Sequence, residues 1–164
     1  MDNILFCSVG RRCALLNDFR KSMHGCGKLI ATDLSPVAPG LFFADQAFLV
    51  PRIDDPSYFE KIFDICDKSK VKAITTLIDP EIEILANHRE ELLTRGILSL
   101  CPAPRTAHLC FNKYEMFKHL SDKGVRTVLT YNSLESLKKG IERGEVNFPV
   151  FMKPVSGNSS KPLP

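Results

Sequence analysis

The sequence predicts an α/β protein, with a doubly wound parallel sheet followed by a smaller, incomplete α+β unit. Through the first hundred residues of the 164-residue chain, short apolar runs alternate with stretches whose apolar residues recur at helical spacing. This alternation is typical of a parallel sheet covered by helices on both faces. The rhythm loosens after Pro102 and Pro104. We therefore expect one domain over residues 1–103 and a second over residues 104–164.

The first βαβ unit is predicted at the start of the chain. Apolar residues run together over residues 3–9 and 28–32, as in buried strands, whereas over residues 11–23 they recur at helical spacing. Glycines mark the ends of the first strand and of the helix, and they are Gly10, Gly25 and Gly27. Strand, helix and strand within about thirty residues are the usual size of such a unit.

The same two patterns complete the predicted sheet. We expect strands at residues 47–50, 71–77 and 97–101, helices at 58–68 and 79–95, and a short helical turn at 41–46. Asp55 and Pro56 have the form of a helix N-cap and a first helical residue. Gly96 ends the last of these helices before the final strand.

The second domain is predicted to be shorter and less regular. We expect helices at residues 106–111, 112–122 and 133–143, and extended runs at 127–131 and 150–153, the latter a strand. Gly124 ends the second of these helices. No internal repeat or low-complexity tract is visible along the chain.

Composition argues against two classes of partner. The formal net charge is only +3, and the basic residues are spread out without interleaved aromatic residues, so nucleic acid is not expected as a partner. No segment approaches the roughly 20 apolar residues that cross a bilayer, and the first residues lack the basic start of a signal peptide. We expect no membrane partner and a cytoplasmic protein.

Cysteine and histidine spacing predicts no metal site. The six cysteines form no CxxC pair and no cluster with histidine, so buried, reduced thiols are expected. The four histidines have neither mutual spacing nor acidic partners that resemble a catalytic or metal site, and we expect them to be structural. They are His24, His88, His108 and His119.

The turn after the first predicted strand carries Gly10, Arg11 and Arg12. A dinucleotide-binding fold keeps a G-x-G-x-x-G motif here, but one glycine remains and two bulky arginines fill the turn. NAD binding is therefore not expected, although Asp33 follows the second strand. Guanidinium groups at a helix N-terminus instead suit a carboxylate or phosphate of a substrate. The simpler alternative is that both arginines are solvated charges.

Acidic residues follow the predicted strand at 71–77. Asp79 and Glu81 should lie at the carboxyl edge of the sheet, where open α/β proteins bind ligands, and Asp79 should point into the crevice. The alternative is that Asp79, Glu81 and Glu83 cap a helix and compensate its dipole. Capping is the preferred interpretation for Glu83, whereas Asp79 and Glu81 stay candidate substrate-binding residues.

The end of the chain has the pattern of a phosphate site. A short apolar run delivers Lys153 to a strand end, and a loop of small residues follows, whose N–H groups can approach a polyphosphate closely. The loop consists of Ser156, Gly157, Asn158, Ser159 and Ser160. Lys113, which follows Asn112 at a helix start, is by itself an ordinary surface charge. Paired with Lys153, it can bracket successive phosphates.

The order of these motifs resembles the start of an ATP-grasp enzyme, and among these the carbamoyl phosphate synthetase large-subunit-like proteins. The motifs are S-x-G-R-R at residues 8–12, N-K at 112–113, K-G-V-x-T at 123–127 and F-P-V-x-x-K-P-x-x-G-x-S-S at 148–160. The resemblance covers residues 2–160. It implies a Rossmann-like pre-ATP-grasp domain followed by the first part of an ATP-grasp domain.

The resemblance also implies roles for the residues of the second domain. Lys113 matches the first nucleotide-contacting lysine of the family, Lys153 matches the lysine that reaches the α- and β-phosphates, and residues 156–160 match the loop that folds over the phosphates. ATP and Mg²⁺ are implied as cofactors of the complete enzyme. Its chemistry converts a carboxylate to an acylphosphate, which an amine or ammonia then attacks.

The sequence departs from the family pattern after the loop. The family's magnesium ligands, adenine-contacting strand and catalytic arginine lie further downstream, and Lys161, Pro162 and Pro164 do not continue into a central strand. We therefore expect a truncated ATP-grasp domain with a partial ATP site, no catalytic residue and no ligation by this chain alone.

Unpaired strand edges in such a fragment predict association, either as a homodimer or with a separate chain that completes the fold. The expected ligand is a small-molecule carboxylate or another anion. An alternative from a different class is a non-catalytic binding or regulatory module. It would hold a small anion or nucleotide with the turn at residues 10–12 and the edge at Asp79.

Overall fold

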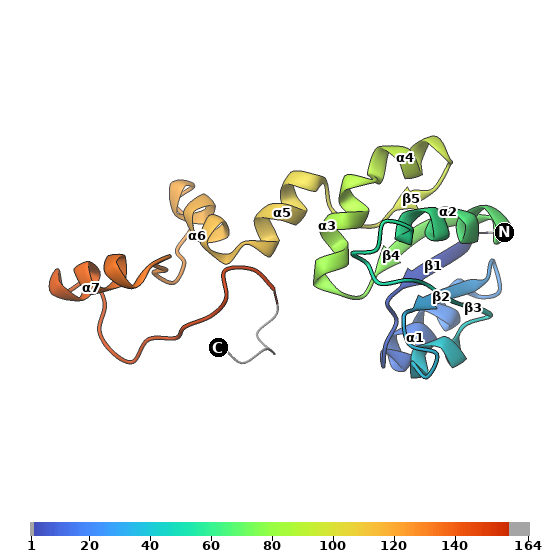
Figure 1. The fold of residues 1–164 in the computed structure, drawn as a ribbon, viewed down its shortest axis with the longest axis horizontal. Coiled ribbons are helices and arrows are strands. Elements are labelled where there is room, and N and C mark those ends of the chain that lie inside the picture. Colours follow the sequence, from blue (N-terminus) through green and yellow to red (C-terminus); the bar gives the residue numbers. More distant parts are fainter. Residues whose placement is uncertain (1, 158–164) are drawn as a thin grey trace. The chain divides into compact units, whose positions relative to one another are not determined.

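The structure, a computed structural model, describes residues 2–157 and divides the chain into two compact units. One unit is Met1–Pro104, and the other begins at Arg105 (Figure 1). The first unit contains a sheet with covering helices, whereas the described part of the second contains helices and irregular segments.

The first unit is built on a five-stranded parallel sheet with the order β3-β2-β1-β4-β5. The strands are β1 (Asn3–Cys7), β2 (Leu29–Asp33), β3 (Gln46–Leu49), β4 (Val71–Thr76) and β5 (Leu98–Ser99). Leu5 of β1 lies opposite Ile30 of β2 and Ile74 of β4. The chain winds outward from β1 first on one side and then on the other, which confirms the predicted doubly wound sheet.

Helices cover both faces of this sheet. Successive strand residues point to opposite faces, so both faces carry apolar side chains that the helices bury. The helices are α1 (Cys13–Met23), the 3₁₀ helix η1 (Pro39–Phe43), α2 (Tyr58–Lys68), α3 (Asp79–Asn87) and α4 (Arg89–Thr94). On one face, Leu5 packs in a buried cluster with residues of α2, α3 and α4. On the other face, the next residue, Phe6, packs with Leu16 of α1 and Leu41 of η1.

Besides shifts of one to three residues at other helix ends, two helix predictions fail for reasons that the contacts explain. The helix expected over residues 79–95 is interrupted at His88, whose ring stacks on that of Phe59 in α2 with centroids 3.6 Å apart. The predicted N-cap at Asp55 is also wrong, because α2 begins at Tyr58. Asp55 instead accepts hydrogen bonds from the N–H and hydroxyl of Ser57 at 2.8 and 2.7 Å, which close a turn ahead of the helix.

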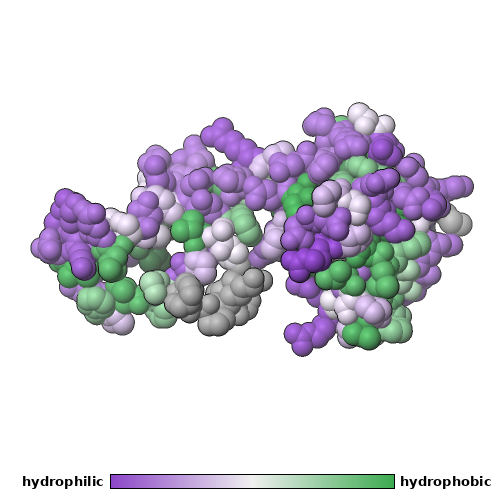
Figure 2. Space-filling model, viewed as in Figure 1, coloured by the Kyte–Doolittle hydropathy of each residue, from purple (hydrophilic) through white to green (hydrophobic). Residues whose placement is uncertain are grey.

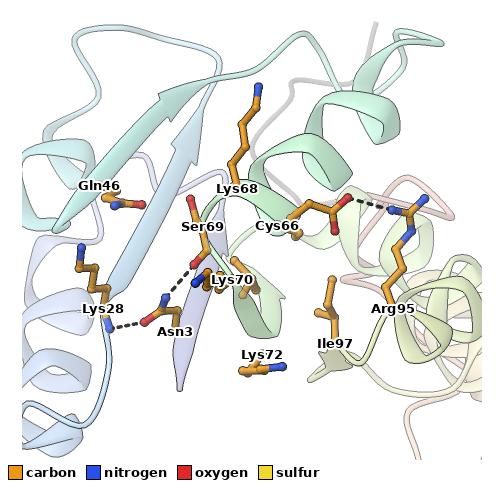
Figure 3. A pocket seen from close by; sticks show the side chains of 12 residues that line it. Asn3, Lys28, Gln46, Cys66, Lys68, Ser69, Lys70, Lys72, Arg95 and Ile97 are labelled. Atoms are coloured by element: carbon orange, nitrogen blue, oxygen red, sulfur yellow. Dashed lines mark hydrogen bonds and ion pairs between the residues drawn. The ribbon is translucent and has the colours of Figure 1, made fainter. Parts of the chain in front are cut away.

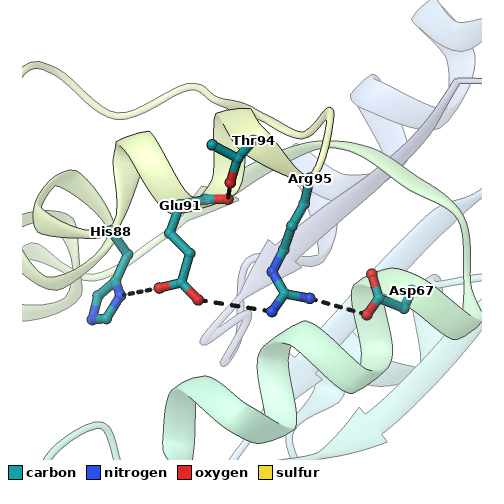
Figure 4. Close-up of polar contacts among 5 residues, drawn as sticks. All are labelled: Asp67, His88, Glu91, Thr94 and Arg95. Carbon is teal, nitrogen blue, oxygen red and sulfur yellow. Dashed lines mark hydrogen bonds and ion pairs between the residues drawn. The ribbon is translucent and has the colours of Figure 1, made fainter.

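A chain of polar contacts joins α4 to α2 (Figure 4). Glu91 lies 3.3 Å from Nδ1 of His88 and 3.8 Å from Arg95, and Arg95 reaches Asp67 at 3.1 Å. The guanidinium of Arg95 also lies 4.2 Å from the centre of the Phe63 ring. These pairs are partly exposed, so each contributes at most about 1 kcal/mol, and we assign them to helix packing.

The second unit contains α5 (Pro104–Phe111), α6 (Lys113–Asp122) and α7 (Leu134–Glu142). The strand predicted at residues 150–153 is wrong, and the run at 127–131 is not a strand either. A strand needs a hydrogen-bonded neighbour, and no strand forms between residues 105 and 157. Phe151 and Met152 are accordingly 91% and 78% exposed.

Cysteine burial, helix length and the clustering of metal-ligand side chains can each be described for this structure. Cys7, Cys66 and Cys101 are buried, but Cys26 and Cys110 are exposed, which corrects the prediction that the thiols are buried. Among residues 2–157, no helix has the length and apolar character needed to span a membrane. The same residues contain no group of three or more His, Cys, Asp or Glu side chains that could hold a metal ion.

Candidate functional site

A crevice of about 320 Å³ opens at the carboxyl edge of the sheet. Segments that follow β1, β2 and β3 line it, together with Tyr58 of α2 and Ile78 after β4. Because the chain reverses direction across the sheet between β1 and β4, this edge is the switch point at which open α/β sheets bind ligands. Gly10 and Arg12 are among the lining residues, whereas Arg11, Asp79 and Glu81 are not.

The turn between β1 and α1 is held in place by the end of β2. The carboxylate of Asp33 accepts hydrogen bonds from the backbone N–H groups of Gly10, at 2.7 Å, and Ser35, at 2.9 Å. Gly10 has a φ of +50°, which glycine adopts without strain. The N–H of Gly40 donates to the carbonyl oxygen of Gly10 at 2.8 Å. Asp33 therefore fixes this turn, a role that sequence reasoning did not assign to it.

The arginines of this turn keep their charge available to a ligand. Arg11 and Arg12 are exposed and, within residues 2–157, neither forms an ion pair with a carboxylate. Arg52, which also lines the crevice, is instead paired with Asp54 at 3.0 Å. The first turn of α1 contains no acidic residue that could neutralise them. Arg12 therefore brings its guanidinium to the crevice, beside the Asp33 carboxylate that accepts hydrogen bonds from the turn, and this guanidinium suits a carboxylate or phosphate.

Asp79 and Glu81 occupy different environments on the other side of the switch point. Asp79 is exposed in the first turn of α3, where a carboxylate compensates the helix dipole. Glu81 is fully buried, and its two oxygens accept hydrogen bonds from the hydroxyls of Tyr58 and Thr76. Thr76 also accepts a hydrogen bond from the N–H of Ile78 at 3.2 Å. Glu81 therefore does not line the crevice, but from the core it holds the hydroxyl of Tyr58, a residue that does line it.

Burial keeps the neighbours of Glu81 protonated. Removal from water, the nearby Cys7 and the Glu81 carboxylate all raise the pKa of Tyr58. Burial and, after it, the charge of Glu81 raise the pKa of the Cys7 thiol well above its ordinary value. A thiolate nucleophile is consequently not available at this position at neutral pH. The sequence analysis did not single out Tyr58 or Thr76. The signal that could have identified Tyr58 is its position at the start of α2.

In the second unit, Lys113 is placed by the cap of α6. Oδ1 of Asn112 accepts hydrogen bonds from the N–H groups of Tyr114 and Glu115, both at 3.1 Å, so Asn112 is the N-cap and Lys113 the first helical residue. The N–H of Lys113 donates to the carbonyl oxygen of Val155 at 2.9 Å. Its ammonium donates to the carbonyl oxygen of Gly157 at 2.6 Å. Lys113 is thereby held against the predicted phosphate loop.

The other predicted nucleotide residues are less constrained. Lys153 and Ser156 are exposed, and Lys153 forms no hydrogen bond or ion pair with residues 2–157. Asn158, Ser159 and Ser160 lie outside the described residues. The structure thus brings together Lys113 and Gly157 from the predicted set, whereas the ammonium of Lys153 has no partner within residues 2–157.

Comparison with known proteins identifies one matching family model. The model describes the N-terminal domain of PylC-like proteins and matches residues 4–100. No curated protein sequence matches the chain. The matched range contains the whole sheet and the turn at residues 10–12.

Three solved structures share this fold at low sequence identity. N5-carboxyaminoimidazole ribonucleotide synthetase from Thermotoga maritima is 23% identical, with a TM-score of 0.65. The biotin carboxylase domain of the Hydrogenobacter thermophilus 2-oxoglutarate carboxylase, solved with MgADP and bicarbonate, is 18% identical, with a TM-score of 0.66. An L-amino acid ligase from Bacillus licheniformis is 15% identical, with a TM-score of 0.66.

Each of these three alignments covers 96% of this chain. The chain spans 40%, 35% and 38% of the respective neighbours. The fold of this chain is therefore that of a part of each of these larger enzymes.

Proposed function

The chain belongs to the family of PylC-like N-terminal domains, and on that premise we propose that it is the front portion of an ATP-dependent ligase that joins a carboxylate to an amine. The observation that carries the proposal is the seating of Lys113 against Gly157. It joins the two segments that resemble the lysine and the phosphate loop of an ATP-grasp enzyme.

The second unit carries the proposed nucleotide-phosphate site. Asn112 orients the first turn of α6, so that Lys113 projects its ammonium toward the loop that begins after Lys153. Two ammonium groups on neighbouring segments can neutralise adjacent phosphates of one nucleotide. The carbonyl of Gly157 is then exchanged for a phosphate oxygen as the partner of Lys113.

The residues present fit ATP better than they fit its metal. When bound, MgATP supplies the phosphoryl group that activates the acid. Residues 2–157 offer ammonium and backbone groups for phosphate, but they hold no cluster of acidic side chains for Mg²⁺. We propose that the metal ligands come from a further segment or a separate chain, consistent with the 35–40% of each neighbour that this chain spans.

The first unit carries a candidate anion site of its own. The rigid turn held by Asp33 carries Arg11 and Arg12, neither of which has a carboxylate partner in residues 2–157, and Arg12 lines the crevice. We propose that they receive the carboxylate or phosphate of the substrate. The S-x-G-R-R turn supports the finer proposal that the enzyme is similar to the carbamoyl phosphate synthetase large subunit.

We also propose a cytoplasmic location. The thiols of Cys26 and Cys110 are exposed, and exposed free thiols fit a reducing compartment.

A completing partner is also part of the proposal. Apolar surface is exposed on the visible face of the second unit (Figure 2). Phe148, Phe151, Met152 and Val128 are each more than 70% exposed. An apolar surface of this kind favours an interface. We propose that the remaining strands of the ATP-grasp sheet cover it, supplied by a further segment, a second copy or a separate chain.

Calorimetric titration with MgATP tests the proposal on the full chain. We expect Lys113→Ala to weaken binding by about tenfold, the effect of losing roughly 1.4 kcal/mol of interaction. Lys118→Ala is the matched control, because Lys118 is exposed on the same helix and makes no ion pair with residues 2–157. Equal weakening in both variants contradicts the proposed site.

One observation favours the alternative of a non-catalytic anion-binding module, namely that Arg12 lines the crevice without a carboxylate partner in residues 2–157. In that case the chain binds a small carboxylate or phosphate without ATP. Binding then depends on Arg11 and Arg12 and is unaffected by Lys113→Ala. The two titrations therefore separate the two functions.

A further inference from the structure

A second hollow lies at the amino edge of the sheet, opposite the crevice. Its volume is about 670 Å³, within the usual range for small-molecule sites. Residues at or next to the start of each of the five strands line it, and they are Asn3, Lys28, Gln46, Lys70 and Ile97 (Figure 3). The hollow is therefore built on the sheet itself and not on a mobile loop.

The hollow gathers positive charge from separate elements. Five cationic side chains line it, and Asp67 is the one acidic residue among the lining. Lys68 pairs with Asp64 at 2.7 Å, and Arg95 pairs with Asp67 at 3.1 Å. Lys28, Lys70 and Lys72 form no ion pair with a carboxylate anywhere in residues 2–157. Lys28 is attracted only at longer range, by Asp45, which is itself paired with Arg20 at 2.7 Å. The concave surface therefore keeps an excess of positive charge, in which the fields of the lysines add.

Asn3 fixes two of these lysines relative to each other. Its amide donates to the carbonyl oxygen of Ser69 at 2.7 Å, and its side-chain oxygen accepts from the N–H of Lys28 at 2.9 Å. Asn3 is buried, so both bonds are protected from water. The backbone positions of Lys28 and Lys70, on either side of β1, are therefore set before any ligand arrives.

Lys70 occupies a backbone position at which lysine is unfavourable. Its φ is +50°, in the left-handed region that costs a residue with a Cβ atom about 1 kcal/mol relative to glycine. Helix α2 ends just before it, so glycine at residue 70 would satisfy the fold. A lysine kept there adds charge to the hollow rather than stability to the turn.

We propose that this amino-edge hollow binds a small polyphosphate through Lys28, Lys70 and Lys72. A compact chain of two or three phosphates suits ammonium groups that come from the start of β2 (Lys28) and the start of β4 (Lys70 and Lys72) around one hollow, and it offsets their mutual repulsion. The site lies on the first unit and does not depend on the nucleotide site proposed on the second.

Nuclear magnetic resonance titration of the full chain with inorganic tripolyphosphate tests this proposal. We expect amide shifts to concentrate at residues 28, 46 and 68–72. The double variant Lys70→Gly with Lys72→Ala should bind about tenfold more weakly, although glycine at residue 70 relieves the backbone and keeps or raises the melting temperature. Lower affinity at unreduced stability separates ligand binding from a structural role.

Control variants and control ligands test whether binding is specific to this hollow. Lys138→Ala together with Lys123→Ala removes the same charge from the second unit, and equal weakening there overturns the proposal in favour of unspecific attraction. Citrate binding as tightly as tripolyphosphate overturns the polyphosphate assignment. Shifts confined to residues 112–114 and 153–157 also overturn it while supporting the nucleotide site. If a nucleoside triphosphate also shifts residues 68–72, the bound phosphates belong to a nucleotide. If only tripolyphosphate shifts them, the ligand is an inorganic polyphosphate.

Discussion

The ammonium group of Lys113 donates a hydrogen bond of 2.6 Å to the carbonyl oxygen of Gly157, 44 residues further along the chain. The backbone N–H of the same residue donates to Val155. One residue at the start of a helix thus holds a distant loop next to the positive end of that helix. An anion that enters here competes with the Gly157 carbonyl for the same donor.

The cap of α6 should contribute to stability as well as position Lys113. Asn112→Ala removes the acceptor for the N–H groups of Tyr114 and Glu115, and we expect the free energy of unfolding to fall by about 1 kcal/mol in urea titrations. Asn112→Asp keeps an oxygen in the same place and should cost little. A loss in Asn112→Asp as large as in Asn112→Ala contradicts the capping role.

The buried carboxylate of Glu81 should be necessary for stability. Glu81→Leu leaves the hydroxyls of Tyr58 and Thr76 without their acceptor in the core, and we expect unfolding to become easier by about 2 to 4 kcal/mol. Glu81→Gln retains one acceptor oxygen and should lose less. Chemical denaturation of both variants checks this order. If Glu81→Leu lowers the free energy of unfolding no more than Glu81→Gln does, the hydrogen bonds of Glu81 to Tyr58 and Thr76 do not stabilise the fold.

Gly40 should not tolerate a side chain. A Cβ atom there would lie 2.9 Å from the side chain of Val9 and 3.0 Å from the carbonyl oxygen of Gly10. We expect Gly40→Ala to lower the free energy of unfolding by about 1 to 3 kcal/mol and to weaken anion binding at the crevice. At Gly25, space is open and only the φ of +77° opposes alanine, so Gly25→Ala is the comparison and should leave anion binding unchanged. Loss of anion binding in Gly25→Ala alone contradicts the role given to Gly40.

The carboxylate of Asp45 should contribute stability that depends on pH. Although partial burial opposes the shift, hydrogen bonds from the N–H of Leu29 and from Arg20 lower the pKa of Asp45 below its ordinary value of 3.8. A carboxylate with a depressed pKa in the folded state stabilises the protein above its unfolded pKa, and this contribution disappears as the pH falls through the folded pKa.

The stability difference between the natural chain and Asp45→Asn should therefore be constant near neutral pH and shrink below about pH 4. Urea unfolding at a series of pH values measures it. Asp18→Asn, at an exposed pair 3.5 Å from Lys21, is the control and should show little difference at any pH. A difference for Asp45→Asn that grows toward low pH contradicts the assignment.

The sheet was predictable from sequence because apolar residues dominate β1 and β2, and because β4 keeps β-branched residues around Lys72. The run at residues 71–77 and the helix at 58–68 were placed within one residue of β4 and α2. The break at His88 was not predictable, because apolar spacing continues through it and the cause is a ring stack on Phe59 in another helix.

The candidate site was harder to predict. The motifs identified Gly10 and Arg12, which line the crevice, and Lys113, which contacts the loop at Gly157. They could not show that Glu81 is buried, since an acidic residue in a first helical turn has the same pattern whether it faces water or the core. The strand expected at residues 150–153 failed because a local pattern cannot supply the neighbouring strand that it needs.

Mapping the contacts of MgATP on the chain tests most sharply whether Lys113 and the loop after Lys153 form a nucleotide site. Amide resonance shifts on titration detect weak binding, which suits a partial site. We predict shifts concentrated at residues 112–114 and 153–157, and their loss in Lys113→Ala but not in Lys118→Ala. Shifts that stay away from these residues, or that persist unchanged in Lys113→Ala, would contradict the proposed site.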